Sequence, residues 1–199
     1  MYEIAVIGTS WGGLSAVSTV VADLPATFAL PLVVVQHRSP DAPGLLAELL
    51  QLRTRLTVVE VEDKQMLLPG HVFVAPPNYH LLFDRGAFAL TTDAPVRYSR
   101  PSIDVTFTSA ADEYGRRAIG IVLTGANEDG ALGLKRIVDR GGYAIVQDPA
   151  TAESAVMPQA ARRAVARSCV LPLPRIAGHL VTIAPPRPPS QRRLGAQLT

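Results

Sequence analysis

The chain has 199 residues, of which 48% are hydrophobic, and a formal net charge of +2. This length is enough for one domain with a large buried core. No stretch approaches the roughly 18 to 20 consecutive apolar residues of a membrane span, so membrane insertion is not expected. The early Glu3, with no basic leader, argues against a signal peptide, and the single Cys169 excludes an intramolecular disulfide and a cysteine-built metal site. We therefore expect a cytoplasmic location.

The positive charge is concentrated toward the C-terminal end. Residues 154–199 contain seven arginines and no carboxylate, which leaves the first 153 residues with a net charge of −5. We interpret this region as a solvated basic edge followed by a tail; a docking surface for an acidic partner is the alternative. The chain has no aromatic-interleaved basic motif, so nucleic acid is not an expected partner.

The first predicted elements are a strand, a tight turn and a helix around Ser10. An apolar run predicts a buried strand over residues 4–7, and apolar residues at helical spacing predict a helix over residues 12–23. Between them, residues 8–12 (Gly-Thr-Ser-Trp-Gly) match G-x-S-x-G, the nucleophile-elbow pattern. Such an elbow turns the serine hydroxyl outward, beside the free amides at the start of the helix.

This segment also has less specific interpretations. Strand, glycine loop and helix form the phosphate-binding unit of doubly wound domains. However, Ser10 stands where the fingerprint G-x-G-x-x-G needs its second glycine, and no P-loop pattern occurs in the chain. A serine that only caps the helix remains the alternative to a nucleophile.

The rest of the chain alternates between predicted strands and helices. Strands are expected at residues 30–36, 56–61, 72–75, 118–123 and 143–147, and a hairpin from residues 79–83 and 88–92. Helices are expected at residues 45–52 with caps offered by residues 39–41, at 102–114 with Ser102 as the cap, from Gly130 to about Arg140, and from near Pro158 to Ala166.

This alternation predicts an α/β fold. We expect a doubly wound, mainly parallel β-sheet with helices on both faces and a small antiparallel hairpin. Residues 1–184 form the expected domain, and the Pro/Arg-rich residues 185–199 are expected to be disordered.

Three reactive side chains follow three predicted strands. Ser10 comes after the first strand, His37 ends the second, and Asp129 lies just beyond the strand at residues 118–123. Ligands of open α/β sheets bind beyond the carboxyl ends of the strands, so these side chains are expected on one rim. A nucleophile, a base and an orienting carboxylate are what acyl transfer needs.

Each of these residues also has an ordinary structural interpretation. His37 could be a histidine whose hydrogen bonds are satisfied at a strand end, and Asp129 could be a helix cap. Glu128 and Asp148 compete with Asp129 for the orienting role. The order Ser, His, Asp differs from the Ser, Asp, His order of α/β-hydrolases, so the elbow does not indicate that fold.

Eight short segments then stand in an order typical of one family. They are residues 7–13 (IGTSWGG), 36–37 (QH), 74–82 (VAPPNYHLL), 100–105 (RPSIDV), 123–125 (LTG), 129–133 (DGALG), 147–149 (QDP) and 157–158 (MP). Together they make residues 4–183 resemble the catalytic domain of the chemotaxis protein-glutamate methylesterases, the CheB type.

This resemblance implies an activity and a set of site residues. The implied reaction is cofactor-free, metal-free hydrolysis of glutamate γ-methyl esters, with glutamine deamidation as a second activity. The implied partners are the methylated cytoplasmic helices of chemoreceptors or a similar signalling protein. Ser10, His37 and Asp129 occupy the positions of the family's triad. The resemblance also implies that His80 lines the same cleft. The sequence without the resemblance indicates a structural role for this histidine.

The chain departs from the family pattern beside the implied site. Trp11 replaces a small residue or threonine after the nucleophile, and Ala126 and Asn127 replace Met-Gly. The backbone amide of Trp11 and those around residues 126–128 are the expected oxyanion donors, each worth about 3 kcal/mol of barrier. Because the first strand starts at Ile4, we expect no N-terminal receiver domain and no gating by one.

Two other functions fit the same residues. One is a non-catalytic signalling or scaffold module in which Trp11 blocks the cleft. The other is an esterase or amidase that acts on a different acyl substrate. The oligomeric state does not follow from the sequence.

Overall fold

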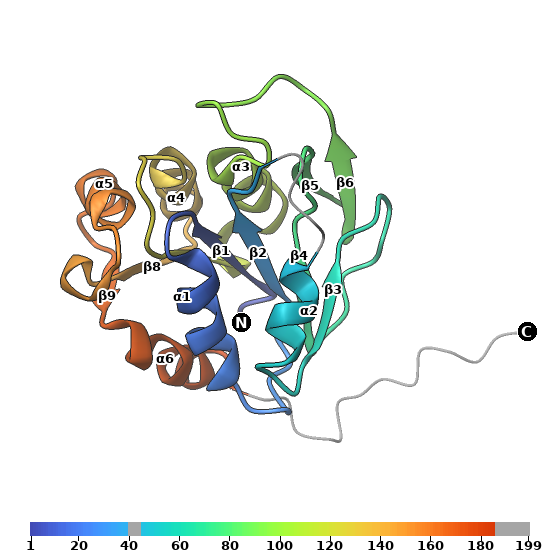
Figure 1. Ribbon diagram of the computed structural model, residues 1–199, viewed down its shortest axis with the longest axis horizontal. Helices are drawn as coiled ribbons and strands as arrows, with labels where there is room; N and C mark the ends of the chain where they lie inside the picture. Colours follow the sequence, from blue (N-terminus) through green and yellow to red (C-terminus); the bar gives the residue numbers. More distant parts are fainter. Residues whose placement is uncertain (40–44, 186–199) are drawn as a thin grey trace, which may run out of the picture.

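The centre of the protein is a seven-stranded parallel sheet (Figure 1). The computed structural model describes residues 1–39 and 45–185, and within them the strand order is β3-β4-β2-β1-β7-β8-β9. Strands β5 and β6 form a separate antiparallel hairpin. The strands are β1 (Ile4–Thr9), β2 (Leu32–Gln36), β3 (Thr57–Glu60), β4 (His71–Val74), β5 (His80–Asp84), β6 (Ala87–Thr91), β7 (Ala118–Val122), β8 (Tyr143–Gln147) and β9 (Cys169–Leu171).

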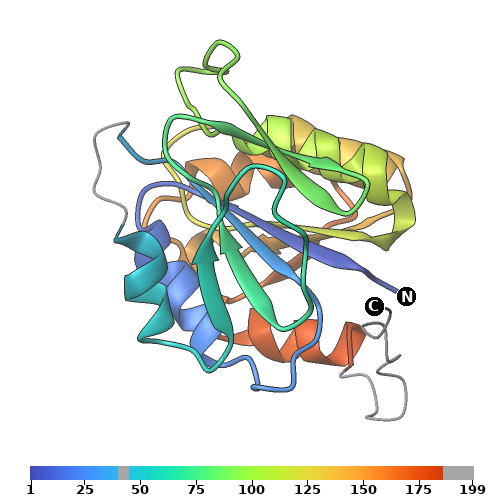
Figure 2. The same cartoon turned by 90° about the vertical axis from the view of Figure 1, so that its right-hand side faces the viewer.

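Helices cover both faces of this sheet, as Figure 2 shows. Helices α3, α4 and α5 and the hairpin pack on one face, and α1, α2 and α6 pack on the other. The helices are α1 (Gly13–Ala22), α2 (Leu46–Gln51), α3 (Ile103–Tyr114), α4 (Ala131–Asp139), α5 (Val156–Ala164) and α6 (Ile176–Ile183).

The central strand β1 shows how the sequence builds these layers. All six of its residues are buried. Because side chains alternate between the faces of a strand, Ile4 and Val6 join the core under α3 and α4, whereas Ala5 and Ile7 join the core under α1. A strand buried on both faces reads as an unbroken apolar run, which is why the pattern predicted it.

The sheet has a topological switch point between the neighbouring strands β1 and β7. These strands are neighbours, but the chain leaves β1 toward β2 through α1 and leaves β7 toward β8 through α4. The two helices lie on opposite faces of the sheet. Such a switch point is where open α/β sheets bind ligands.

The predicted fold class is confirmed, with small shifts in element ends. The predicted strand at residues 143–147 matches β8, and Ser102 caps α3 by accepting a hydrogen bond from the Val105 amide. Helix α5 ends at Ala164 rather than Ala166. The structure adds β9 and α6, which lie inside the expected domain but were not predicted as elements. Of the expected disordered tail at residues 185–199, residues 186–199 lie outside the described residues, as do two of the expected caps, Pro40 and Asp41.

Two helical glycines give a matched test of the packing between α3 and α4. A Cβ on Gly133 of α4 would lie 2.5 Å from the Cβ of Phe107 and 2.9 Å from the backbone oxygen of Asp104. We expect Gly133→Ala to force the helices apart and lower the free energy of unfolding by about 1–3 kcal/mol in urea titrations. A Cβ on Gly178 of α6 meets nothing within 4 Å, so Gly178→Ala should be neutral or stabilise by up to about 1 kcal/mol. Equal effects of the two variants would contradict this packing.

Candidate active site

Ser10 lies at the tip of a tight turn between β1 and α1. Gly12 adopts a left-handed conformation with φ of 75°, and α1 begins at the next residue. The amide of Gly13 donates to the Ser10 carbonyl at 2.9 Å, which closes the turn. A left-handed backbone at this position favours glycine, so the second glycine of the elbow pattern has a conformational reason.

Thr124, two residues after the end of β7, fastens this turn to the sheet. The Thr124 carbonyl accepts hydrogen bonds from the Ser10 amide at 3.0 Å and from the Thr9 hydroxyl at 2.8 Å. The Thr124 hydroxyl donates to the carbonyl of Trp11 at 2.9 Å. The position of Ser10 is therefore fixed from the neighbouring strand.

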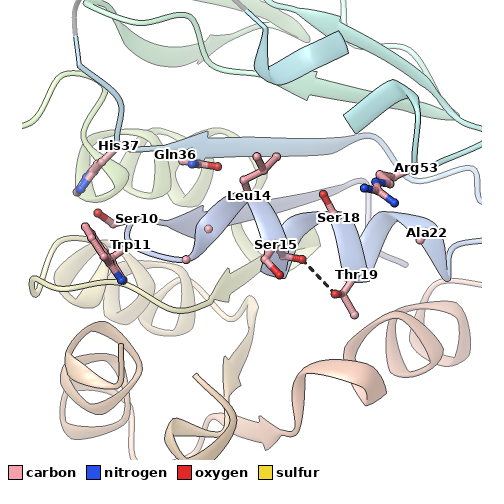
Figure 3. A pocket seen from close by; sticks show the side chains of 12 residues that line it. Ser10, Trp11, Leu14, Ser15, Ser18, Thr19, Ala22, Gln36, His37 and Arg53 are labelled. Carbon is pink, nitrogen blue, oxygen red and sulfur yellow. Dashed lines mark hydrogen bonds between the residues drawn. The ribbon is translucent and has the colours of Figure 1, made fainter. Parts of the chain in front are cut away.

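Ser10 and His37 line one cavity of about 900 Å³ that runs along α1. In Figure 3 the Ser10 hydroxyl and the His37 ring point toward one another at one end of this cavity, and Arg53 lies at the other end. Trp11 lies beside Ser10 at the rim, with 64% of its surface exposed. Its ring is therefore not packed into the interior of the protein.

The imidazole of His37 contacts a buried carboxylate. His37 follows β2, and its Nε2 lies 2.8 Å from Oδ2 of Asp129, in the loop between β7 and α4. Asp129 is 0% exposed, whereas 11% of the His37 side chain remains exposed. Of the three carboxylates considered from the sequence, Asp129 makes this contact; Glu128 is exposed and pairs with Arg163, and Asp148 caps the turn Pro149–Thr151.

The start of α3 surrounds the Asp129 carboxylate with further donors. The backbone amides of Ile103 and Asp104 donate to it at 2.7 and 3.0 Å, and the Ser102 hydroxyl donates at 3.0 Å. The Gly130 amide adds a bond of 3.1 Å. Asp129 therefore does act as a helix cap, but for α3, which precedes it in the chain, and it holds His37 at the same time.

These bonds decide the ionisation of Asp129. Burial alone would raise the pKa of this carboxyl, but the hydrogen bond from His37 and the backbone amides of Asp104 and Ile103 hold the pKa of Asp129 below its usual value. The carboxylate is thus ionised and accepts hydrogen bonds only, so the proton in its contact with His37 belongs to Nε2.

A second carboxylate, Asp104, links α3 to α4 in the opposite direction. Asp104 in α3 accepts a hydrogen bond of 2.7 Å from the amide of Gly133 in the first turn of α4. Burial raises the pKa of Asp104, and the nearby charge of Asp129 raises it further. Asp129 thus caps α3 and Asp104 caps α4, and this exchange of carboxylates fixes the loop that carries Asp129.

The second ring nitrogen of His37, Nδ1, lies near two polar side chains. The hydroxyl of Ser99 and the side-chain nitrogen of Asn127 each lie 3.4 Å from it. The sequence analysis missed Ser99, because no motif or spacing marks it. The only signal was its position three residues before the capping Ser102.

The turn and the loop after β7 also present free backbone amides. Within residues 1–39 and 45–185, no backbone or side-chain acceptor is bonded to the amides of Trp11, Ala126 or Asn127. These three belong to the set expected from the sequence to hold an oxyanion, which comprised the amides of Trp11 and of residues 126–128.

His80 lies behind the site rather than in the cavity. It is 1% exposed, its Nδ1 accepts a hydrogen bond from the Ser102 amide at 3.1 Å, and its Nε2 lies 3.2 Å from the Ala94 carbonyl. His80 is absent from the cavity lining and supports the start of α3.

Four of the seven arginines in the basic C-terminal region, at positions 162, 163, 167 and 175, are exposed. The other three lie outside the described residues. Among the described residues, no group of three or more His, Cys, Asp or Glu is placed to hold a metal ion. No helix in the same part of the chain is long and apolar enough to cross a membrane.

Comparison with known proteins identifies the family. The family model described as CheB methylesterase matches residues 5–180. This chain belongs to the CheB methylesterase family. The resemblance noted in the sequence is therefore confirmed. The expectation that the chain is a hydrolase of the methylesterase type is confirmed with it.

Individual relatives support this assignment. A putative protein-glutamate methylesterase/protein-glutamine glutaminase of Leptospira interrogans is 45% identical over 88% of this chain and 92% of its own length. The protein-glutamate methylesterase FrzG of Myxococcus xanthus is 40% identical over 90% of this chain, which corresponds to 54% of the relative. The crystal structure of the CheB methylesterase catalytic domain of Thermotoga maritima matches with a TM-score of 0.87 and 33% identity, over 92% of this chain and 99% of that domain.

The ionisation of Asp129 predicts how stability depends on pH. A depressed pKa in the folded state adds stability above the unfolded value, near 3.8, that is lost as the pH falls through the folded pKa. Asp129→Asn removes this contribution, and we expect the variant to be less stable than the wild type by about 2 kcal/mol or more at pH 7. The difference should shrink below about pH 4. Urea titrations from pH 3 to 7 measure it, and a difference that stays constant over this range would contradict the assignment.

Proposed function

We propose that this protein is a protein-glutamate methylesterase that hydrolyses glutamate γ-methyl esters on chemoreceptor helices, with Ser10, His37 and Asp129 as its catalytic triad. The observation that carries the proposal is the 2.8 Å contact between His37 and the buried Asp129, beside a serine on an elbow. The names of the relatives support the substrate class. We propose that the same site also deamidates glutamine.

The proton path follows from the orientation of the His37 ring. Because Nε2 carries its proton toward Asp129, Nδ1 holds the lone pair that takes the proton of Ser10 during attack on the ester carbonyl. Asp129 then stabilises the imidazolium. The proton on Nδ1 then passes to the departing methanol. In the second step His37 takes a proton from water, which attacks the acyl-enzyme, and the proton returns to Ser10 as the glutamate leaves.

The free amides supply the electrostatic part of the mechanism. A tetrahedral intermediate on Ser10 places its oxyanion near the amides of Trp11, Ala126 and Asn127, which have no other acceptor among the described residues. The replacement of the family's Met-Gly by Ala126 and Asn127 leaves these backbone donors in place. Donors that are already oriented need no reorganisation during the reaction.

The open cavity suits a side chain presented by another protein. The exposed rim beside Ser10 and the polar wall of α1 formed by Ser15, Ser18 and Thr19 leave the site accessible from outside. A buried pocket for a small molecule would instead enclose its ligand. The exposure of Trp11 also argues against the alternative of a scaffold whose cleft this ring blocks.

Removal of the nucleophile tests the proposal directly. We expect Ser10→Ala to lower methanol release from methylated receptor fragments by about 10⁴-fold or more, because attack on the ester is lost. Ser18→Ala, another hydroxyl on the cavity wall, serves as the matched control and should keep the fold. If Ser10→Ala retains full activity, Ser10 is not the nucleophile.

Trp11 allows a test of substrate class. We expect Trp11→Ala to raise KM for a receptor fragment by about threefold to tenfold, because an exposed aromatic at the rim contributes to binding of a protein surface. Hydrolysis of a small ester should change by less than twofold. Turnover of small esters combined with none on receptor fragments would instead favour an esterase for another acyl substrate.

A further inference from the structure

Asn127 approaches the proposed base from a loop position where the family pattern has glycine. The orientation of its carboxamide is defined by its hydrogen bonds. The amide of Asp129 donates to Oδ1 of Asn127 at 3.1 Å, so this end of the carboxamide is the oxygen. The NH₂ group is therefore the end that lies 3.4 Å from Nδ1 of His37.

The state of Nδ1 follows from the other side of the ring. Asp129 accepts the proton on Nε2, so Nδ1 of the neutral ring carries a lone pair. An NH₂ group can only donate, and it satisfies this lone pair. Ser99, also at 3.4 Å, can donate or accept because its hydroxyl rotates, so Ser99 does not select one state of the ring.

The Ser10 hydroxyl makes no hydrogen bond to another residue within the described part of the chain, although it faces the ring. Asn127 therefore occupies, with its NH₂ group, the Nδ1 lone pair to which the Ser10 hydroxyl would otherwise donate. We propose that Asn127 is a positioning residue that restrains Ser10 in the resting enzyme, by donating its side-chain NH₂ to Nδ1 of His37. This inference rests on the proposed function, since it assigns Nδ1 as the base for Ser10.

The restraint has a chemical consequence at the moment of attack. When Nδ1 takes the proton of Ser10, it becomes an N–H group and no longer accepts from Asn127. The carboxamide must then turn its NH₂ group away from the ring. Free Ser10 is thus less reactive than a serine already bonded to its base, and binding of the substrate has to displace Asn127.

Two substitutions separate this role from a purely structural one. Asn127→Asp keeps an oxygen for the Asp129 amide but replaces the NH₂ donor with an acceptor, which favours a proton on Nδ1. Asn127→Ala loses both groups and leaves Nδ1 free. A residue that only closed the loop would tolerate Asn127→Asp and would be harmed by Asn127→Ala.

The first readout is the ¹⁵N NMR signal of the His37 ring at pH 7.5, which needs no catalytic activity. We expect unprotonated Nδ1 and protonated Nε2 in the wild type and in Asn127→Ala, with the Nδ1 signal displaced in the variant because a hydrogen bond is lost. In Asn127→Asp we expect protonated Nδ1. Identical ring signals in all three proteins would overturn the proposal.

The second readout is the rate at which a fluorophosphonate probe labels Ser10 at pH 7.5, with Ser10→Ala as the blank. We expect labelling about fivefold faster in Asn127→Ala and at least about fivefold slower in Asn127→Asp, the size typical of one hydrogen bond. Gln159→Glu, the same amide-to-carboxylate change on the exposed surface of α5, should label at the wild-type rate.

Each remaining outcome is decisive. Equal rates in the wild type and both Asn127 variants, or slower labelling in Asn127→Ala, would overturn the restraint. If no protein is labelled at Ser10, the proposed nucleophile is wrong, while the ring signals still decide whether Asn127 donates to Nδ1.

Discussion

The ionised carboxylate of Asp129 is the group on which the rest of the site depends. It is fully buried, and it is stable there because α3 points its first amides and the Ser102 hydroxyl at it. The same carboxylate holds His37 by Nε2. A buried charge without these donors would cost several kcal/mol, so the helix start and the histidine are required together. The packing of α3 against α4 therefore positions Asp129 and His37 in the site as well as stabilising the fold.

The two ends of the His37 ring are held in different ways. Nε2 meets a carboxylate fixed by four further donors, whereas Nδ1 meets two weaker groups, at 3.4 Å each, on the loops before α3 and α4. The side facing Asp129 is thus set by the core of the domain. The Nδ1 side is lined by Ser99 and Asn127, which lie on loops, and Asn127 is one of the chain's departures from the family pattern.

The sequence predicted what local patterns can encode. Apolar runs revealed the buried strands, and the glycines around Ser10 revealed the elbow. The carboxyl ends of parallel strands then predicted that Ser10, His37 and Asp129 share one rim, and the structure brings His37 and Asp129 into contact. The capping of α3 by Asp129, the support from His80 and the approach of Ser99 and Asn127 to His37 depend on residues that meet only in the folded chain. Strand β9 is three residues long and only half-buried, so it left no clear apolar run.

The claim that Ser10 and His37 work as one unit is tested most directly by a double-mutant cycle on methanol release from a methylated receptor fragment. Rates are compared for the wild type, Ser10→Ala, His37→Ala and the double variant. If the histidine acts only through the serine, the double variant is no slower than the more damaged single variant. Losses that multiply in the double variant would show that the two side chains act independently, and would contradict a shared proton transfer.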